Sequence, residues 1–165
     1  MQPSEALGVA AQVAVTLAGF AGIVVVFRPQ SVHEWSALDR VRLTLLLINS
    51  VSPLVFSLFG MMLLSVDPVP TSIWRWCSGF AFVSAVLVLV STNPKRRLST
   101  GELRTINKFI FYSGGMMVMA AAALQVINFA VWNQFWPFFA SIFVYLVAAV
   151  IQFLRMLLLP PRQAS

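Results

Sequence analysis

Charged residues are scarce in this sequence. Only 10% of the 165 residues are Asp, Glu, Lys or Arg, and only five residues are acidic. Soluble domains usually contain about 25% charged residues. Because 59% of the residues are apolar and the mean hydropathy is +0.87, a chain of this length would expose too much apolar surface to water. The sequence therefore predicts an integral membrane protein.

Residues that carry catalytic chemistry are also scarce. Cys77 is the only cysteine and His33 the only histidine, which excludes an intrachain disulfide and any strong metal-binding motif. No ionisable residue lies near the centre of a predicted span, which argues against ion-coupled transport and membrane hydrolysis. We expect no catalytic residue, no metal site and no cofactor, and a protein that is not an enzyme.

Five apolar stretches are long enough to cross a bilayer, which takes about 20 residues of helix. They cover residues of about 6–27, 41–65, 72–91, 107–131 and 136–159. Little chain remains between them, and no internal repeat stands out. The predicted fold class is an all-α integral membrane protein, a bundle of five transmembrane helices that forms a single domain over residues 1–165.

The basic residues predict the orientation of this bundle. Five spans place ten of the eleven Lys and Arg residues on one side and only Arg75 on the other. Cytoplasmic loops collect basic residues, so we expect the N-terminus outside and the C-terminus in the cytoplasm, in a bacterial inner (plasma) membrane. Topology then explains the net charge of +6, and no nucleic-acid partner is expected.

Local patterns predict where some helices begin. The stretch from Ser36 to Asp39 resembles a capping box, which would start the second helix before its apolar segment. A second capping box, from Ser99 to Glu102, is predicted for the fourth helix. Pro137 suits the first turn of the fifth helix, where a missing N–H costs little.

Polar residues line one side of the second predicted helix. At about 100° per residue its Asn, Ser and Pro residues share a side, and shorter polar rows occur on the other helices. An unpaired amide or hydroxyl is costly in hydrocarbon, so this polar seam should face protein or a polar path. The seam residues are Asn49, Ser50, Ser52, Pro53, Ser57, Gln125, Asn128, Tyr145 and Gln152.

Helix packing is the alternative explanation for the seam, because small residues let helices approach closely and polar side chains bond between them. The first helix has two such faces, which suggests one contact within the protomer and one with a neighbour. One face contains Gly8, Gln12, Thr16, Gly19 and Gly22. The packing residues predicted across the chain are Ala10, Ala14, Ala18, Gly22 and Gly114.

A basic cluster lies between the third and fourth spans. It consists of Lys95, Arg96, Arg97, Arg104 and Lys108. Such a cluster could contact an anionic lipid headgroup, or it could serve only to set topology.

Three functions remain open. A homo-oligomeric channel or pore fits the neutral seam and the second small-residue face of the first helix best. The alternative is a sensor or carrier for a lipid or apolar small molecule, with Asn49, Gln125 and Tyr145 as polar contacts in its pocket. The third is a non-catalytic assembly subunit of a larger membrane complex. The expected partners are membrane lipids and further copies of the chain.

Overall fold

The computed structural model describes residues 1–27, 35–91 and 108–158, with the side chains of 108–113 left out. Every regular element within these residues is helical. The helices are α1 (Pro3–Phe27), α2 (Ala37–Leu64), α3 (Ile73–Ser91), α6 (Lys108–Ile127) and α7 (Phe135–Leu158), with a π-helical turn, η2 (Asn128–Trp132), before α7.

Five helical segments are long and apolar enough to cross a membrane. Each falls within a few residues of a predicted span, and the fourth runs from α6 through η2. The all-helical class and the number of long apolar helices are therefore confirmed, and they indicate a membrane protein.

α2 begins ahead of its apolar segment because a side chain caps its first turn. Ser36 Oγ accepts a hydrogen bond from the Asp39 N–H at 3.2 Å. This confirms Ser36 as the N-cap of the second helix, which is one half of the predicted capping box. The box predicted from Ser99 to Glu102 lies outside the described residues.

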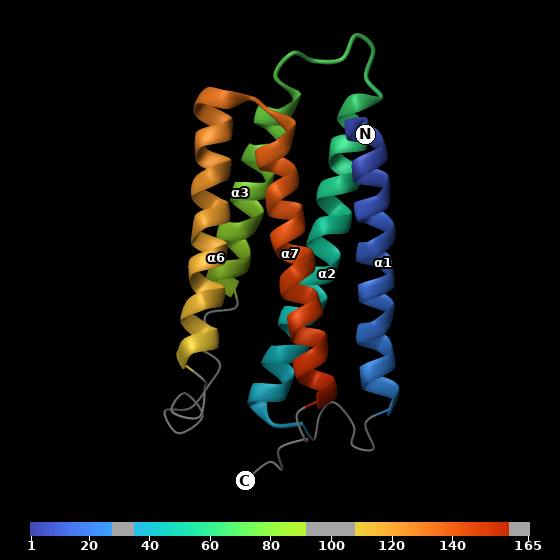
Figure 1. Ribbon diagram of the computed structural model, residues 1–165, viewed down its shortest axis with the longest axis vertical. Coiled ribbons are helices and arrows are strands. Elements are labelled where there is room, and N and C mark those ends of the chain that lie inside the picture. The colour runs from blue at the N-terminus through green and yellow to red at the C-terminus, as the bar shows by residue number, and fades with distance from the viewer. Residues whose placement is uncertain (28–34, 92–107, 159–165) are drawn as a thin grey trace.

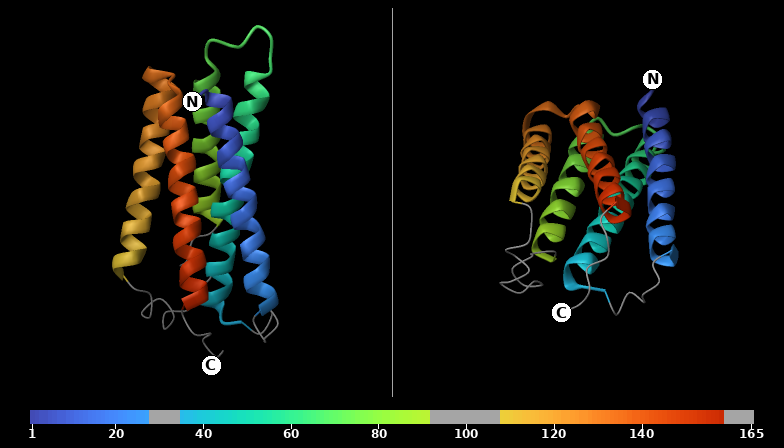
Figure 2. Two further views of the ribbon diagram at one scale, coloured as in Figure 1. Left: turned by 45° about the vertical axis from the view of Figure 1, so that its right-hand side comes forward. Right: turned by 60° about the horizontal axis from the view of Figure 1, so that its bottom comes forward.

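The helices form two groups that meet at one end (Figure 1). α1, α2 and α7 pack together, and α3 lies beside α6. We call the end with the α2–α3 turn, at the top of Figure 1, the upper end, and the opposite end the lower end. Both Figure 1 and the left view of Figure 2 show α6 diverging from α7 toward the lower end.

The upper core joins both groups around one phenylalanine. The ring centroid of Phe56 lies 5.8 Å from that of Phe80 and 5.6 Å from that of Tyr145, both in edge-on contact. The ring of Phe138 lies 6.4 Å away. Phe56 on α2 therefore contacts α3 and α7 at once.

Gly60, one turn above Phe56, lets three helices approach α2 closely. A Cβ atom at this position would lie 2.8 Å from Leu7 Cδ1 on α1 and 3.5 Å from Phe138 Cε1 on α7, and Cys77 Sγ on α3 lies 3.9 Å away. A side chain at this position would displace the end of the Leu7 side chain, whereas the contacts with Phe138 and Cys77 are ordinary van der Waals distances.

The lower core comes from α1, α2 and α7, together with Trp35 before α2. Its buried members are Leu17, Ala21, Val24, Trp35, Leu43, Leu46, Ala149 and Met156. None of the described side chains of α3 and α6 belongs to this cluster. The α3–α6 pair is therefore attached to the rest of the bundle through its upper part.

Side-chain amides make much of this upper attachment, and we call Gln125, Asn128 and Asn133 the amide cluster. Asn128 Nδ2 donates to Ser78 Oγ at 2.7 Å and to the Gln134 carbonyl at 3.0 Å. Asn128 Oδ1 accepts from the Gln134 N–H at 2.9 Å. One fully buried side chain thus links η2, α3 and the start of α7.

The other two amides extend this link. Asn133 has a left-handed backbone, with φ of 51°, and its Oδ1 accepts from the Arg75 N–H at 3.1 Å. That N–H belongs to the first turn of α3 and also donates to the Ser72 carbonyl at 3.0 Å. Asn133 Nδ2 donates to the Thr71 carbonyl at 2.7 Å, and Gln125 Nε2 donates to the Pro137 carbonyl at 2.8 Å.

α1 presents two different faces, as predicted from its two rows of small residues. Ala10 and Ala14 are buried in the bundle and Ala18 is half-buried. The other row points away from the bundle, since Gly8 is half-buried and the rest are exposed: Gln12, Thr16, Gly19 and Gly22. A Cβ atom added at Gly8, Gly19 or Gly22 would meet nothing within 4 Å.

We predict that Asn128→Leu lowers the free energy of unfolding by about 2 kcal/mol, because it removes one hydrogen bond to α3 and two to the Gln134 main chain, and side-chain hydrogen bonds in membrane proteins average about 0.6 kcal/mol each. Gln134→Leu is the matched control, because its side chain is exposed and its hydrogen bonds to Asn128 use the main chain. Thermal unfolding in detergent, followed by circular dichroism, measures both. Equal losses for the two variants would contradict the role of Asn128.

Candidate functional site

Two spaces lie next to α2 at mid-height of the bundle. One is a groove between α2 and α3. The other is an interior cavity where α2, α3, α6 and α7 meet. Phe56 lines the groove, and the Tyr145 ring that contacts it lines the cavity, so the two spaces share this aromatic wall.

The groove is the larger space, with a volume of about 300 Å³. Its apolar lining residues are Leu47, Ile48, Val51, Val55, Phe56 and Val88. Leu47, Val51 and Val55 are 41–44% exposed, so the groove opens on the outer surface of the bundle. In a membrane that surface faces lipid.

Two hydroxyl groups interrupt the apolar lining of the groove. Ser52 lines it from α2 and Ser84 lines it from α3, and both residues are half-buried. Within the described part of the chain, neither side chain makes a hydrogen bond. Two hydroxyls in an apolar groove can each bond to a polar atom of a bound molecule.

The interior cavity is small and has more polar groups. Its volume of about 20 Å³ leaves room for about one water molecule. Asn49, Gln125, Ser141 and Tyr145 are its polar lining residues. The space exists because small side chains surround it on three helices, namely Ala81, Ala85, Ala121, Ala122 and Ala148.

Only part of the hydrogen-bonding capacity around the cavity is used. Ser141 Oγ donates to the Phe138 carbonyl at 2.8 Å, and Gln125 Nε2 is held by Pro137. Gln125 Oε1 is buried and has no partner. The Tyr145 hydroxyl makes no hydrogen bond among the described residues. The Asn49 amide also makes no hydrogen bond among the described residues. These groups thus remain open, and an unpaired buried acceptor is costly.

The predicted seam on α2 divides between these spaces and the packed interior. Asn49 lines the cavity and Ser52 lines the groove. Ser50, Pro53 and Ser57 are buried in the bundle. Ser50 Oγ donates to its own helix at the Leu46 carbonyl, 2.8 Å away, and Ser57 Oγ has no partner. None of the seam residues on α2 is fully exposed.

The remaining predicted site residues lie elsewhere. Asn128 belongs to the amide cluster, and Gln152 lies two turns below Tyr145 with its buried Oε1 unpaired. Gly114 is exposed, and a Cβ atom added there would meet nothing within 4 Å. The basic cluster of residues 95–108 lies outside the described side chains.

Charged side chains gather at the lower end of α2 and α7. Arg42 Nη1 donates to Asp39 Oδ1 at 3.0 Å, and Asp39 is 1% exposed. Arg155 on α7 is half-buried and interacts electrostatically with Arg42. No group of three or more potential metal ligands occurs in the described ranges.

The sequence placed Asn49, Gln125 and Tyr145 in one pocket, and the structure brings these three side chains to one cavity. Binding at this cavity stays a prediction. Sequence reasoning did not single out the pair Ser52 and Ser84 as facing each other across a groove. The spacing of Ala81, Ser84 and Val88 was the available signal, since it predicts one face of α3.

Comparisons with known proteins add no assignment to this geometry. No protein-family model, curated protein or solved structure matches the chain.

Proposed function

We propose that this protein is a membrane-embedded binding protein, and not an enzyme, that takes up an apolar molecule from the bilayer as a sensor or carrier. The observation that carries this proposal is the groove of about 300 Å³ between α2 and α3, which opens toward lipid. Ligand sites in proteins start at about this volume and are mostly apolar, with a few polar groups that orient the ligand. The groove has this composition.

The polar groups indicate what the bound molecule contains. Ser52 and Ser84 in the groove, and the Tyr145 hydroxyl with Gln125 Oε1 in the cavity, offer donors and acceptors without partners. Among the described side chains, no Asp, Glu, Lys, Arg or His lines either space. The part of the ligand at this level is therefore neutral, an apolar body with at most a hydroxyl, carbonyl or amide.

A matched pair of variants on α3 tests this binding site. Ser84→Phe fills the groove, while Val83→Phe adds the same ring at a neighbouring position that is 55% exposed. With hexadecan-1-ol and hexadecanoic acid as probes, we predict that at least one raises the melting temperature of the wild type and of Val83→Phe by about 5–10 °C near saturation. Ser84→Phe should show no rise.

Either of two results would remove this proposal. One is that neither probe stabilises the wild type. The other is that Ser84→Phe retains the full stabilisation, which would place the probe elsewhere on the protein.

A homo-oligomeric channel is the second candidate, because of the outer face of α1. Gln12 lies near the middle of a 25-residue helix, it is exposed, and its side chain makes no hydrogen bond within the described residues. A free amide in hydrocarbon is costly, and Gly19 on the same face would allow a close approach. A second copy of the chain that packs through the same face would give the Gln12 amide a hydrogen-bond partner and would lie close to Gly19. The inward position of Ser50 and Ser57 favours packing over pore lining for that part of the seam.

Self-association is tested by the mass of the purified particle in nanodiscs, measured by light scattering. We predict that the wild type is larger than a monomer and that the double variant Gln12→Leu/Gly19→Leu is monomeric. Val13→Leu, exposed on another side of the same helix, is the control and should keep the wild-type mass. A monomeric wild type would exclude a ring-shaped channel, and an unchanged double variant would move the interface away from α1.

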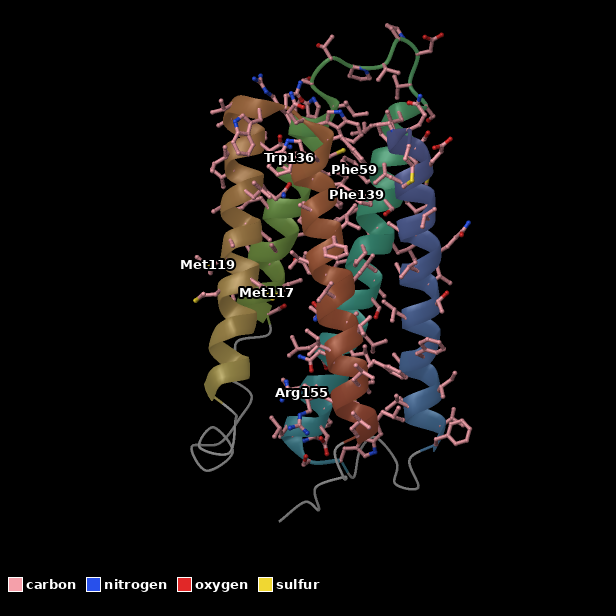
Figure 3. The ribbon with its side chains drawn as sticks, viewed as in Figure 1. Phe59, Met117, Met119, Trp136, Phe139 and Arg155 are labelled. Carbon is pink, nitrogen blue, oxygen red and sulfur yellow. The ribbon has the colours of Figure 1, made fainter. Side chains whose placement is uncertain are left out.

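We further propose that the upper end faces outward and the lower end faces the cytoplasm, in a bacterial inner membrane. Exposed Trp132 and Trp136 mark the upper end, with ring centroids 5.4 Å apart, and indoles favour the membrane interface. Figure 3 shows Trp136 at that end and Arg155 near the other. Cytoplasmic segments of membrane proteins are rich in basic residues, so the basic residues of this chain favour a cytoplasmic lower end.

Labelling of single cysteines tests this orientation. In a Cys77→Ala background, Ser4→Cys and Thr71→Cys are exposed near the upper end and should react with a membrane-impermeant maleimide in intact cells. Lys95→Cys should react only after the cells are permeabilised. The reverse pattern would invert the proposed topology.

A further inference from the structure

Among the residues that the structure describes, the charged side chains at the lower end of α2 and α7 are unbalanced. One carboxylate, Asp39, accompanies two guanidinium groups, Arg42 and Arg155. Asp39 bonds to Arg42, and no carboxylate of the described residues pairs with Arg155. The remaining nearby charge on α2, Arg40, is also positive, and its side chain is exposed.

Arg42 also retains an unused donor. Its Nε atom is buried without a hydrogen-bond partner, and the side chain is 11% exposed. Arg155 is half-buried and its charge acts on that of Arg42. Like charges repel more strongly when they are partly removed from water. An anionic group between the two guanidinium groups would relieve this repulsion and occupy the free donor.

Both arginines lie on helix sides that lead to the cavity. Arg42 is seven residues before Asn49, and Arg155 is seven residues after Ala148, and both of these residues line the cavity. Seven residues are two helical turns, so each arginine lies about 10 Å below the cavity on the same side of its helix.

We propose that Arg42 and Arg155 bind the anionic headgroup, a carboxylate or a phosphate, of a membrane amphiphile whose chain runs up to the cavity and the groove. This inference rests on the proposed binding function and names its ligand class. Guanidinium groups bind carboxylates and phosphates through paired hydrogen bonds, a geometry that the ammonium group of a lysine does not offer. The neutral lining of the groove then accommodates the chain.

The test uses the full chain in nanodiscs of zwitterionic lipid at pH 8. Hexadecanoic acid, hexadecan-1-ol and acetate are titrated separately, and the rise in melting temperature gives each apparent affinity. We expect the acid to bind the wild type at least about tenfold more tightly than the alcohol, since hydrogen bonds to charged groups exceed neutral ones by about this factor. Acetate alone should not stabilise the protein.

Arg155→Gln should remove the preference for the acid, and Arg40→Gln should keep it. Arg40→Gln is matched because it removes the same charge from an exposed position at the same end. Arg155→Gln breaks no ion pair of the described residues, so it should fold. If it does not, Arg155→Lys keeps the charge, loses the paired geometry and should lower the preference in part.

The outcomes separate this inference from the function on which it rests. If acid and alcohol bind equally and Ser84→Phe abolishes both, the groove binds a ligand and the arginines do not select it. If acetate stabilises as well as the acid, the arginines hold a free anion and no amphiphile. If Arg40→Gln and Arg155→Gln have equal effects, only the general positive charge matters, and the inference is overturned. If no probe binds, the proposed function itself fails.

Discussion

Asn128 fixes the upper end of the α3–α6 pair and ties it to the turn that leads into α7, and the position of that pair depends on these hydrogen bonds. Its amide joins η2, α3 and the start of α7 within a fully buried environment, and the neighbouring amides of Gln125 and Asn133 complete the link. In hydrocarbon these groups have no water as an alternative partner. The α3–α6 pair is therefore fixed at its upper end, whereas the lower core is made by α1, α2 and α7.

This uneven attachment accounts for the two spaces beside α2. Above them, Phe56 and its aromatic neighbours fill the region between α2, α3 and α7. Below that level α6 diverges from α7 (Figure 1). Alanines of α3, α6 and α7 line the cavity at this height. Polar groups follow the same division. Asn128 and Asn133 at the upper end are bonded to other segments, while Gln125 Oε1 and the serines of the groove keep unused capacity next to the open volume.

The fold could be predicted from the sequence to a large extent because the hydrocarbon core sets helix length. Five spans and the cap at Ser36 follow from local patterns alone. The polar side of α2 was also predicted to face protein, and its residues are buried or half-buried. The meeting of Asn49, Gln125 and Tyr145 was expected because each lies on the polar side of its helix.

Other features depend on which helices pair, and local patterns do not contain this information. On α1, both the alanine row and the Gly8–Gly22 row are small enough for helix packing, and only the neighbours of α1 decide that the alanines turn inward. Likewise, Ser50 and Ser52 belong to one predicted seam, but Ser50 bonds within its own helix and Ser52 lines the groove. The charge imbalance at Arg42 and Arg155 arises between α2 and α7, which are far apart in sequence.

The central claim is that the space beside α2 holds a molecule taken from the membrane. Native mass spectrometry of the full chain, released from nanodiscs made directly from the host membrane, tests it most directly. The account predicts one acidic amphiphile retained by each wild-type chain and absent from the groove-filled Ser84→Phe chain. A bare wild-type chain, or the same adducts in equal amounts on both chains, would contradict it.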